Sequence, residues 1–261
     1  MYGRAALITG VSRRAGIGYA IARRLAALGA SLFLHHYTPH DRDQPRGADP
    51  GGIGAVIDGI ASALVGGSAR VHDAELDLAE PGASERLINA AAGTSGHVDI
   101  LICNHARSGG DGPLGTLTAA MLDAHWAVNT RSSILLAQAF AAQHDGRPGG
   151  RIVFMTSGQD LGPMPGEVAY AATKGALASV TRTLADQLAG QAITLNTVNP
   201  GPVDTGGYPP DVLRALRSRF PQGRWGTPDD PARLVAWLAT DEAAWITGQV
   251  INTEGGFRRF G

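Results

Sequence analysis

The sequence predicts an α/β fold in which a doubly wound parallel sheet carries helices on both faces. Short apolar runs alternate with longer helical patterns along the 261 residues. Most short runs are continuously apolar rather than alternating, which is typical of strands buried on both faces. This β-α alternation favours parallel strands joined by crossover helices, and we expect one domain covering residues 1–261.

Each expected strand is a short apolar run bounded by turn-forming residues. The seven runs are Ala5–Thr9, Ser31–His35, Arg70–Leu76, Ile100–Cys103, Ile152–Thr156, Ile193–Val198 and Gln249–Asn252. Helical patterns separate them, namely Ile17–Leu28, Ile53–Val65, Ala83–Ala92, Ala119–Gln143, Val168–Leu188 and Pro228–Thr240.

Two polar segments rich in Pro and Gly follow strand ends, where open α/β sheets bind their ligands. Residues 37–52 form a cofactor or substrate flap or a solvated loop. Residues 204–226, with a short helical patch at 212–219, are expected to form a substrate lid.

Composition excludes several classes of function. The net charge is about −1 and charges of both signs are scattered, so neither nucleic acid nor a membrane surface is an expected partner. The N-terminus leads directly into a strand, so no signal peptide is expected. The single cysteine, Cys103, closes an apolar run and is expected to be a core residue of a cytoplasmic protein.

A glycine-rich turn joins the first strand to the first helix. Gly10, Gly16 and Gly18 allow a tight turn, and the amides at the helix start favour a pyrophosphate. The turn also contains Ser12, Arg13, Arg14 and Ile17. Its place between a strand and a helix predicts dinucleotide binding.

The second strand ends without the carboxylate that marks NAD. The chain reads His35-His36-Tyr37 there, while Arg13 and Arg14 lie in the glycine turn. This pattern favours the 2′-phosphate of NADP(H) over NAD(H), unless the arginines are ordinary solvated charges. The two histidines do not predict a metal site, because neighbouring side chains on a strand point to opposite faces. Asp77, after the third strand, either contacts the adenine or caps the next helix.

Lys174 is the only lysine among 22 basic residues, and it follows Tyr170 by four positions. On a helix these two side chains share a face. A nearby ammonium favours the phenolate, so Lys174 is expected to lower the pKa of Tyr170 and make it a usable acid or base.

These motifs together resemble the short-chain dehydrogenase/reductase family, most closely its 3-oxoacyl-(acyl-carrier-protein) reductases. The resemblance runs nearly end to end and rests on the glycine turn, Cys103-Asn104-His105-Ala106, Asn129, Ser157, Tyr170-x-x-x-Lys174, Asn199–Thr205 and Trp245–Gly256. It implies a Rossmann-like sheet of order 3-2-1-4-5-6-7. It also implies a homotetramer built on the helices 119–143 and 168–188 and the last strand.

The resemblance implies roles for four residues in reducing a carbonyl. Tyr170 would protonate the carbonyl oxygen, Ser157 would hold it, Lys174 would support the tyrosine and the nicotinamide ribose, and Asn129 would hold a water. Cofactor contacts are implied for Gly10, Ser12, Arg13, Arg14, Gly16, Ile17, Gly18, His36, Asp77, Leu78, Asn104, Ala106, Tyr170, Lys174, Pro200, Gly201, Val203 and Thr205.

Two features depart from the family's usual pattern. Five residues separate Gly10 from Gly16 instead of three, which is similar to enoyl reductases. Those enzymes separate Tyr and Lys by six residues, however, so carbonyl reduction is favoured. His105 replaces a usual alanine and is either a substrate-pocket residue or a support for the loop.

Three functions remain open. The leading one is NADPH-dependent reduction of a ketone, which includes an acyl-carrier-protein-bound β-ketoacyl thioester. The second is NAD-dependent oxidation of a secondary alcohol. The third is a nucleotide-binding sensor or scaffold without turnover, against which the complete set of Ser157, Tyr170 and Lys174 argues.

Overall fold

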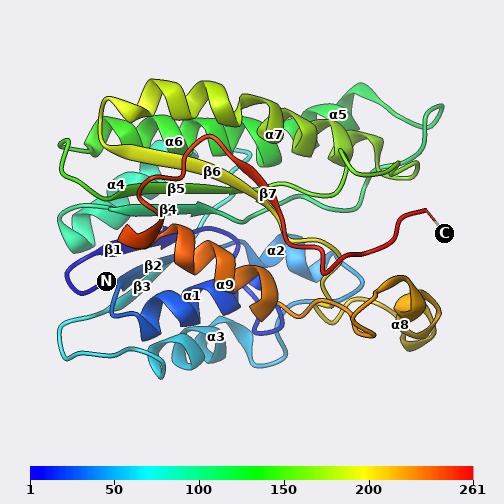
Figure 1. Ribbon diagram of the computed structural model, residues 1–261, viewed down its shortest axis with the longest axis horizontal. Helices are drawn as coiled ribbons and strands as arrows, with labels where there is room; N and C mark the ends of the chain where they lie inside the picture. The colour runs from blue at the N-terminus through cyan, green and yellow to red at the C-terminus, as the bar shows by residue number, and fades with distance from the viewer. Residues whose placement is uncertain (261) are drawn as a thin grey trace.

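A seven-stranded parallel sheet runs through the computed structural model, which describes residues 1–260, and helices cover both faces (Figure 1). Gly261, the last residue of the expected domain, lies outside the described residues. The strand order β3-β2-β1-β4-β5-β6-β7 confirms the prediction. The strands are β1 (Ala5–Ile8), β2 (Ser31–His36), β3 (Val71–Glu75), β4 (Ile100–Cys103), β5 (Gly150–Met155), β6 (Ile193–Asn199) and β7 (Val250–Asn252).

The longer helices connect the strands as crossovers. They are α1 (Ile17–Ala27), α2 (Thr38–Arg42), α3 (Gly52–Ala61), α4 (Ala83–Ser95), α5 (Ala119–His125), α6 (Ser132–Gln143), α7 (Val168–Ala189), α8 (Pro210–Leu216) and α9 (Asp229–Leu238). Three short turns are the π-helical η1 (Trp126–Arg131) and the 3₁₀ turns η2 (Arg217–Arg219) and η3 (Asp241–Ala243).

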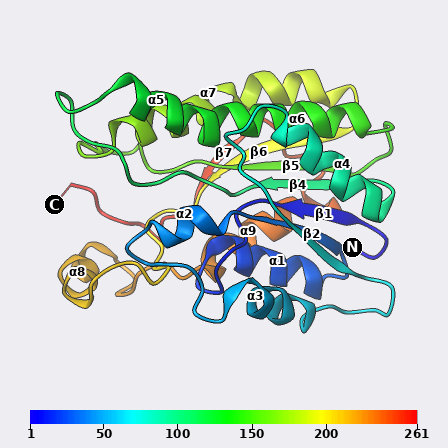
Figure 2. The same ribbon diagram turned by 180° about the vertical axis from the view of Figure 1, so that it is seen from behind.

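Alternation along each strand builds two separate cores. Ile8 and Leu34 are buried on the face covered by α1, α3 and α9, whereas Leu7 and Phe33 are buried on the face covered by α4, α6 and α7 (Figures 1 and 2). Each fully buried large aliphatic side chain contributes about 1.5–3 kcal/mol relative to an exposed one. Cys103 belongs to the second core, as expected.

Two elements differ from the prediction. The helix expected over residues 119–143 contains the π-helical turn η1, where the hydroxyls of Ser132 and Ser133 donate to the carbonyls of Val128 and Asn129. These hydroxyls satisfy carbonyls that the wider turn leaves less well paired. The polar segment 37–52 contains the short helix α2, whose Pro39 suits a first helical turn.

The sheet order reverses between β1 and β4, which places a crevice at the carboxyl ends of these strands. The glycine turn, the segment after β4 and the start of α7 all meet there. Within residues 1–260, no helix is both long enough and apolar enough to span a membrane.

Candidate active site

The glycine turn is packed so closely that side chains are excluded. Gly10 has φ of 72°, and a Cβ on it would lie 2.7 Å from the Cα of His105. A Cβ on Gly18 would lie 2.6 Å from the backbone oxygen of Gly10. Helix α1 starts at Ile17 without a side-chain cap, so its first amides face the crevice and favour an anion.

The two arginines of this turn point in different directions. Arg13 lines the crevice and donates from Nη1 to the Thr205 carbonyl at 3.2 Å. Arg14 instead forms an ion pair with Asp49 at 2.8 Å and does not line the crevice. Arg14 is held away from the crevice because the segment after β2 supplies a buried carboxylate that binds it, and its cofactor contact stays a prediction.

The two histidines at the end of β2 face opposite sides of the sheet. His35 lines the crevice and accepts a hydrogen bond from the Gly10 amide at 3.3 Å. His36 lies beside Asp73 at 3.1 Å and does not line the crevice. Strand alternation thus places His35 rather than His36 at the crevice, and the cofactor contact of His36 stays a prediction.

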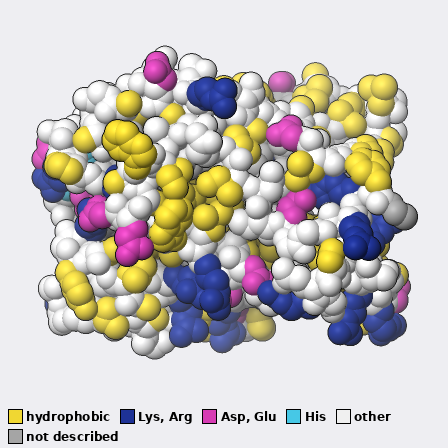
Figure 3. Space-filling model, in the orientation of Figure 1, with side chains coloured by type: hydrophobic (Ala, Val, Ile, Leu, Met, Phe, Trp, Pro, Cys, Tyr) yellow, Lys and Arg dark blue, Asp and Glu magenta, His cyan; other side chains and the backbone are white. Residues whose placement is uncertain are grey.

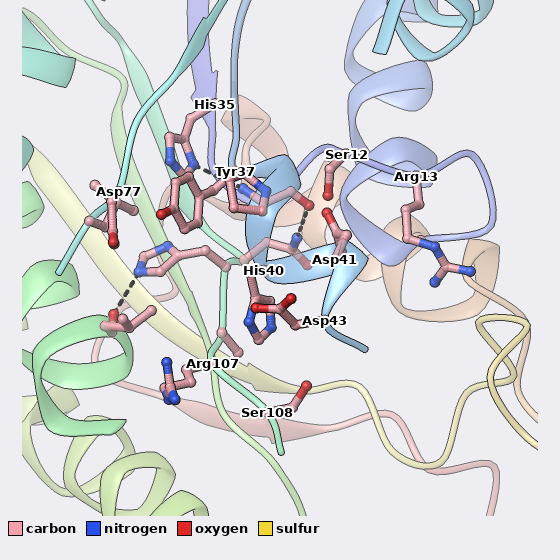
Figure 4. A pocket seen from close by; sticks show the side chains of 18 of the residues that line it. Ser12, Arg13, His35, Tyr37, His40, Asp41, Asp43, Asp77, Arg107 and Ser108 are labelled. Atoms are coloured by element: carbon pink, nitrogen blue, oxygen red, sulfur yellow. Dashed lines mark hydrogen bonds between the residues drawn. The ribbon is translucent and has the colours of Figure 1, made fainter. Parts of the chain in front are cut away.

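The crevice is a cavity of about 450 Å³ (Figure 4). The expected residues that line it are Gly10, Ser12, Arg13, Gly16, Ile17, Asp77, Leu78, Asn104, Ala106, Tyr170 and Thr205. Sequence reasoning missed Tyr37, Pro39, His40, Asp41, Asp43, Arg107 and Ser108, which also line it. The Thr38-Pro39 pair is typical of a helix start, and this signal could have predicted α2 next to the site.

Several basic side chains of the crevice have a buried nitrogen without a hydrogen-bond partner. Among the described residues, the buried atoms Arg13 Nε, Arg107 Nε and His40 Nε2 make no hydrogen bond. Burial, followed by the charge of Arg46, lowers the pKa of Arg13. No ion pair within residues 1–260 joins Arg13, Arg46 or Arg107 to a carboxylate. Buried unpaired donors are costly, so these residues fit a phosphate-bearing cofactor.

The segment after β4 supports the glycine turn. Asn104 donates from Nδ2 to the carbonyls of Thr9 and Gly10 at 3.1 and 3.0 Å. His105 bonds at both ring nitrogens, to Thr9 Oγ1 at 2.6 Å and to Ser132 Oγ at 2.8 Å. Burial lowers the pKa of His105 to about 3. Of the two roles left open for His105, the structure supports the loop support.

Tyr170 and Lys174 lie in the first two turns of α7. The Lys174 Nζ lies 5.6 Å from the centroid of the Tyr170 ring and donates to the Met155 carbonyl at 2.7 Å. Lys174 is 2% exposed, and burial lowers its pKa to about 8. The shared helix face expected from the spacing is therefore present.

The pKa of Tyr170 differs from the expectation. Burial raises the pKa of Tyr170 to about 12, Glu167 adds to the rise, and a hydrogen bond from Ser157 opposes it. The expected lowering by Lys174 is wrong for this structure, because the ammonium is bound to the Met155 carbonyl and desolvation outweighs the opposing effects. The phenol is thus held in its protonated form at neutral pH.

Ser157 and Asn129 have different surroundings in the site. Ser157 follows β5 and hydrogen-bonds the Tyr170 side chain. Asn129 lies in η1, is fully buried, and brackets the Arg107 backbone by accepting from its amide at 2.7 Å and donating to its carbonyl at 3.2 Å. It also donates to Thr173 Oγ1 at 3.0 Å. Asn129 thereby ties α7 to the segment after β4.

The segment after β6 reaches the crevice at one residue. Thr205 lines it, whereas Pro200, Gly201 and Val203 do not. Gly201 has φ of 69°, and a Cβ there would lie 2.7 Å from the Cα of Glu254. Glycine is therefore required at position 201 because the backbone packs closely against the chain after β7.

Known proteins resemble the chain over almost its full length. Residues 10–258 match the family model described as enoyl-(acyl carrier protein) reductase. The uncharacterized oxidoreductase YjdA of Bacillus subtilis is 43% identical, with 97% of this chain and 96% of YjdA covered. The NADPH-dependent aldehyde reductase-like protein of Arabidopsis thaliana is 32% identical, covering 98% and 94%. A short chain dehydrogenase from Burkholderia cenocepacia, solved in complex with NADP, is 35% identical with a TM-score of 0.83 and covers 98% of both chains.

With this fold, this crevice and these relatives, the chain belongs to the short-chain dehydrogenase/reductase family. It is an oxidoreductase of the NAD(P)-dependent kind that interconverts carbonyl and alcohol groups of small molecules. Tyr170 lines the crevice, and Ser157 lies beside the Tyr170 side chain.

Proposed function

We propose that this chain uses NADPH to reduce a ketone to a secondary alcohol. The observation that carries the proposal is the protonated Tyr170, hydrogen-bonded to Ser157, at the end of a crevice whose guanidinium groups lack carboxylate partners. A phenol with a pKa of about 12 is protonated at neutral pH, and reduction needs a proton donor.

NADPH supplies the hydride when bound. The residues of the chain then act on the oxygen, where negative charge develops. The hydroxyls of Ser157 and Tyr170 donate to it, and Tyr170 transfers its proton as the alcohol forms. The buried ammonium of Lys174, 5.6 Å from the centroid of the Tyr170 ring, is kept in place on the same helix face by the Met155 carbonyl. Asn129 keeps α7 and the Arg107 backbone in register.

Preference for NADPH rests on Arg13 and Arg107. Both present an unpartnered buried Nε in the crevice, and guanidinium groups bind phosphate well. The NADP of the Burkholderia cenocepacia complex and the NADPH in the name of the Arabidopsis thaliana relative point the same way.

The second candidate is NAD-dependent oxidation of a secondary alcohol. It is favoured by Asp41 and Asp43, which α2 and the residue after it bring into the crevice. A carboxylate there would bond a ribose 2′-hydroxyl and repel a 2′-phosphate. A sensor or scaffold without turnover is the third candidate, and the complete Ser157–Tyr170–Lys174 set argues against it.

Residues 204–226 are proposed to close over the substrate. A parallel bridge between Val203 and Gly226 holds the two ends of this lid together, while α8 between them has no buried residue. Tyr208 and Trp225, with ring centroids 5.0 Å apart, give it an aromatic face. This face suits an apolar ketone, such as a β-ketoacyl thioester with or without acyl carrier protein. We further propose a single domain in a cytoplasmic protein, in which Cys103 stays a buried free thiol.

The test compares NADPH and NADH binding by cofactor fluorescence in the wild type, Arg13→Ala and Arg14→Ala. We expect Arg13→Ala to weaken NADPH binding roughly 10- to 100-fold, the worth of a charged hydrogen bond, with little change for NADH. Arg14→Ala is the matched control, since Arg14 pairs with Asp49, and it should leave the NADPH-to-NADH ratio unchanged.

Turnover is then measured with ketones and β-ketoacyl thioesters, with Tyr170→Phe alongside. Loss of the acid should cost on the order of 10²–10⁴-fold in kcat while NADPH still binds. Preference for NADH in the wild type would favour the oxidative candidate. Full activity of Tyr170→Phe would remove the enzymatic assignment.

A further inference from the structure

The chain after β7 runs along the open side of the site. This C-terminal segment, residues 253–260, passes between α8 of the lid and the region where α7 begins (Figures 1 and 2). It is far in sequence from both neighbours. Its contacts therefore decide how the lid and the Ser157 loop, residues 157–162, are placed relative to each other.

Arg259 lies directly on the Ser157 loop. A Cβ built on Gly158 would overlap the guanidinium of Arg259, and one built on Gly162 would lie 2.5 Å from its Cδ. Neither glycine has a positive φ among the described residues. Their small size therefore serves the close approach of the Arg259 side chain rather than a special backbone conformation.

A largely buried ion pair fixes this arginine. Its guanidinium pairs with Glu254, and the two side chains are 16% and 10% exposed. Glu254 also accepts a hydrogen bond from Asn199 Nδ2 at 2.8 Å, which ties the pair to the end of β6. The guanidinium further lies 5.3 Å from the ring centroid of Phe257. Arg259 is thus held from three sides.

The same segment binds the lid. The Arg258 amide donates to the Arg219 carbonyl at 2.9 Å, and the rings of Phe257 and Phe220 lie 4.8 Å apart. Phe220 in turn stacks with Trp225 at 5.0 Å. One short stretch of chain therefore contacts the lid on one side and the loop that carries Ser157 on the other.

We propose that Arg259, held by Glu254, is a positioning residue that fixes the Ser157 loop against the lid and so sets where Ser157 meets the substrate oxygen. Arg259 acts through the loop. The expected effect of Arg259 on kcat rests on the proposed function, whereas its expected effect on the placement of the lid does not.

The kinetic experiment compares Arg259→Ala with Arg258→Ala, a neighbouring exposed arginine whose side chain has no hydrogen bond among the described residues. We expect Arg259→Ala to lower kcat on the order of 10²-fold, because a small misplacement of a reacting group has this effect. NADPH affinity by fluorescence should stay unchanged in both variants. Arg259→Lys should recover part of kcat, since an ammonium can still pair with Glu254.

A second variant separates positioning from general damage. Gly158→Ala should displace the guanidinium and lower kcat in the wild type. In the Arg259→Ala background the nearest remaining atom is Glu254 Oε1 at 3.1 Å, so the added methyl should cause a much smaller loss. Equal losses from Gly158→Ala in both backgrounds would overturn the proposal, as would kcat of Arg259→Ala equal to that of Arg258→Ala.

Limited trypsin digestion supplies a readout that needs no turnover. The lid contains Arg214, Arg217, Arg219 and Arg224, and cleavage there is followed by mass spectrometry. Faster cleavage of the lid in Arg259→Ala than in Arg258→Ala supports the proposal even if no ketone is ever reduced, in which case only the proposed function fails. Identical lid cleavage in the two variants would overturn the coupling to the lid.

Discussion

Burial, rather than the nearest charge, governs the ionisable residues of this site. Tyr170 stays protonated, Lys174 has its pKa lowered to about 8, and His105 stays neutral, all with desolvation as the largest cause. His105 lines the crevice, and both of its ring nitrogens are engaged, one with Thr9 and the other with Ser132. Its titration therefore affects stability.

The stability of the protein should fall in acid through His105. The pKa of His105 is lowered to about 3 in the folded chain, against about 6.5 in an unfolded one. Between these values the unfolded state binds one more proton, so the free energy of unfolding decreases as pH falls, by about 1.4 kcal/mol per pH unit. Urea unfolding from pH 7 to 4.5 should show a shallower slope in His105→Gln, with a cost of about 1–3 kcal/mol at pH 7.

His72→Gln provides the control, because His72 is exposed on β3. It should keep the slope of the wild type. His35, which is also buried with its pKa lowered to about 4, contributes the same sign in every variant. The prediction for His105 is rejected if His105→Gln and wild type lose stability in acid at the same rate.

At the scale of elements, the start of α7 is capped by another segment. Asp111, from the loop after β4, accepts hydrogen bonds from the amides of Tyr170 at 2.7 Å and Ala169 at 3.0 Å. Burial would raise the pKa of Asp111, but the amide bonds outweigh it and the pKa is lowered. The carboxylate thus holds the helical turn that carries Tyr170.

Asp111→Ala should destabilise the protein and lower kcat together. Loss of a helix-capping carboxylate costs about 0.5–2 kcal/mol, and the loosened first turn misplaces Tyr170. Because the folded pKa is lowered, this stabilisation exists above the unfolded pKa and is lost as pH falls. Melting temperature and kcat are measured against Asp123→Ala, an exposed aspartate of α5. A variant at Asp111 that behaves like the one at Asp123 would exclude the capping role.

The sequence was sufficient for the face shared by Tyr170 and Lys174, which follows from helical periodicity. The sheet order was correct as well, but it came from the family resemblance of the motifs rather than from local patterns. The sequence was insufficient where the result depends on the direction of a side chain or on the burial of a charged group. The family resemblance implied cofactor contacts for His36 and Arg14, but neither lines the crevice, because strand parity and loop path cannot be read from neighbours alone. The pKa of Tyr170 was misjudged because desolvation depends on the packed fold. Helix α2 was missed inside a segment whose polar composition resembles a loop.

At the scale of the whole molecule, apolar side chains remain exposed on the face of α9 and the sheet edge. Trp245 is 99% exposed, Val250 on the edge strand β7 is 41% exposed and Trp237 on α9 is 37% exposed. Figure 3 shows an apolar cluster over α9 and the chain leading to β7. Leu122 and Trp126, on α5 and η1, form a second exposed pair. Such patches favour association.

We expect a homotetramer that uses both apolar surfaces. Size-exclusion chromatography with light scattering should give four times the 27.0 kDa chain mass. Trp245→Glu should yield a smaller species, because a charge would be buried at a contact. Leu28→Glu, at the end of α1 and 41% exposed, is the control. A wild-type monomer would contradict the prediction.

The burial of Lys174 has a practical consequence. It is the only lysine in the chain, and its side chain is closed off behind β5 and α7. An amine-reactive reagent therefore finds no lysine on the folded surface. Acylation of Lys174 would require the active site to open, so the rate of acylation reports how often the site opens. A bound cofactor should lower that rate.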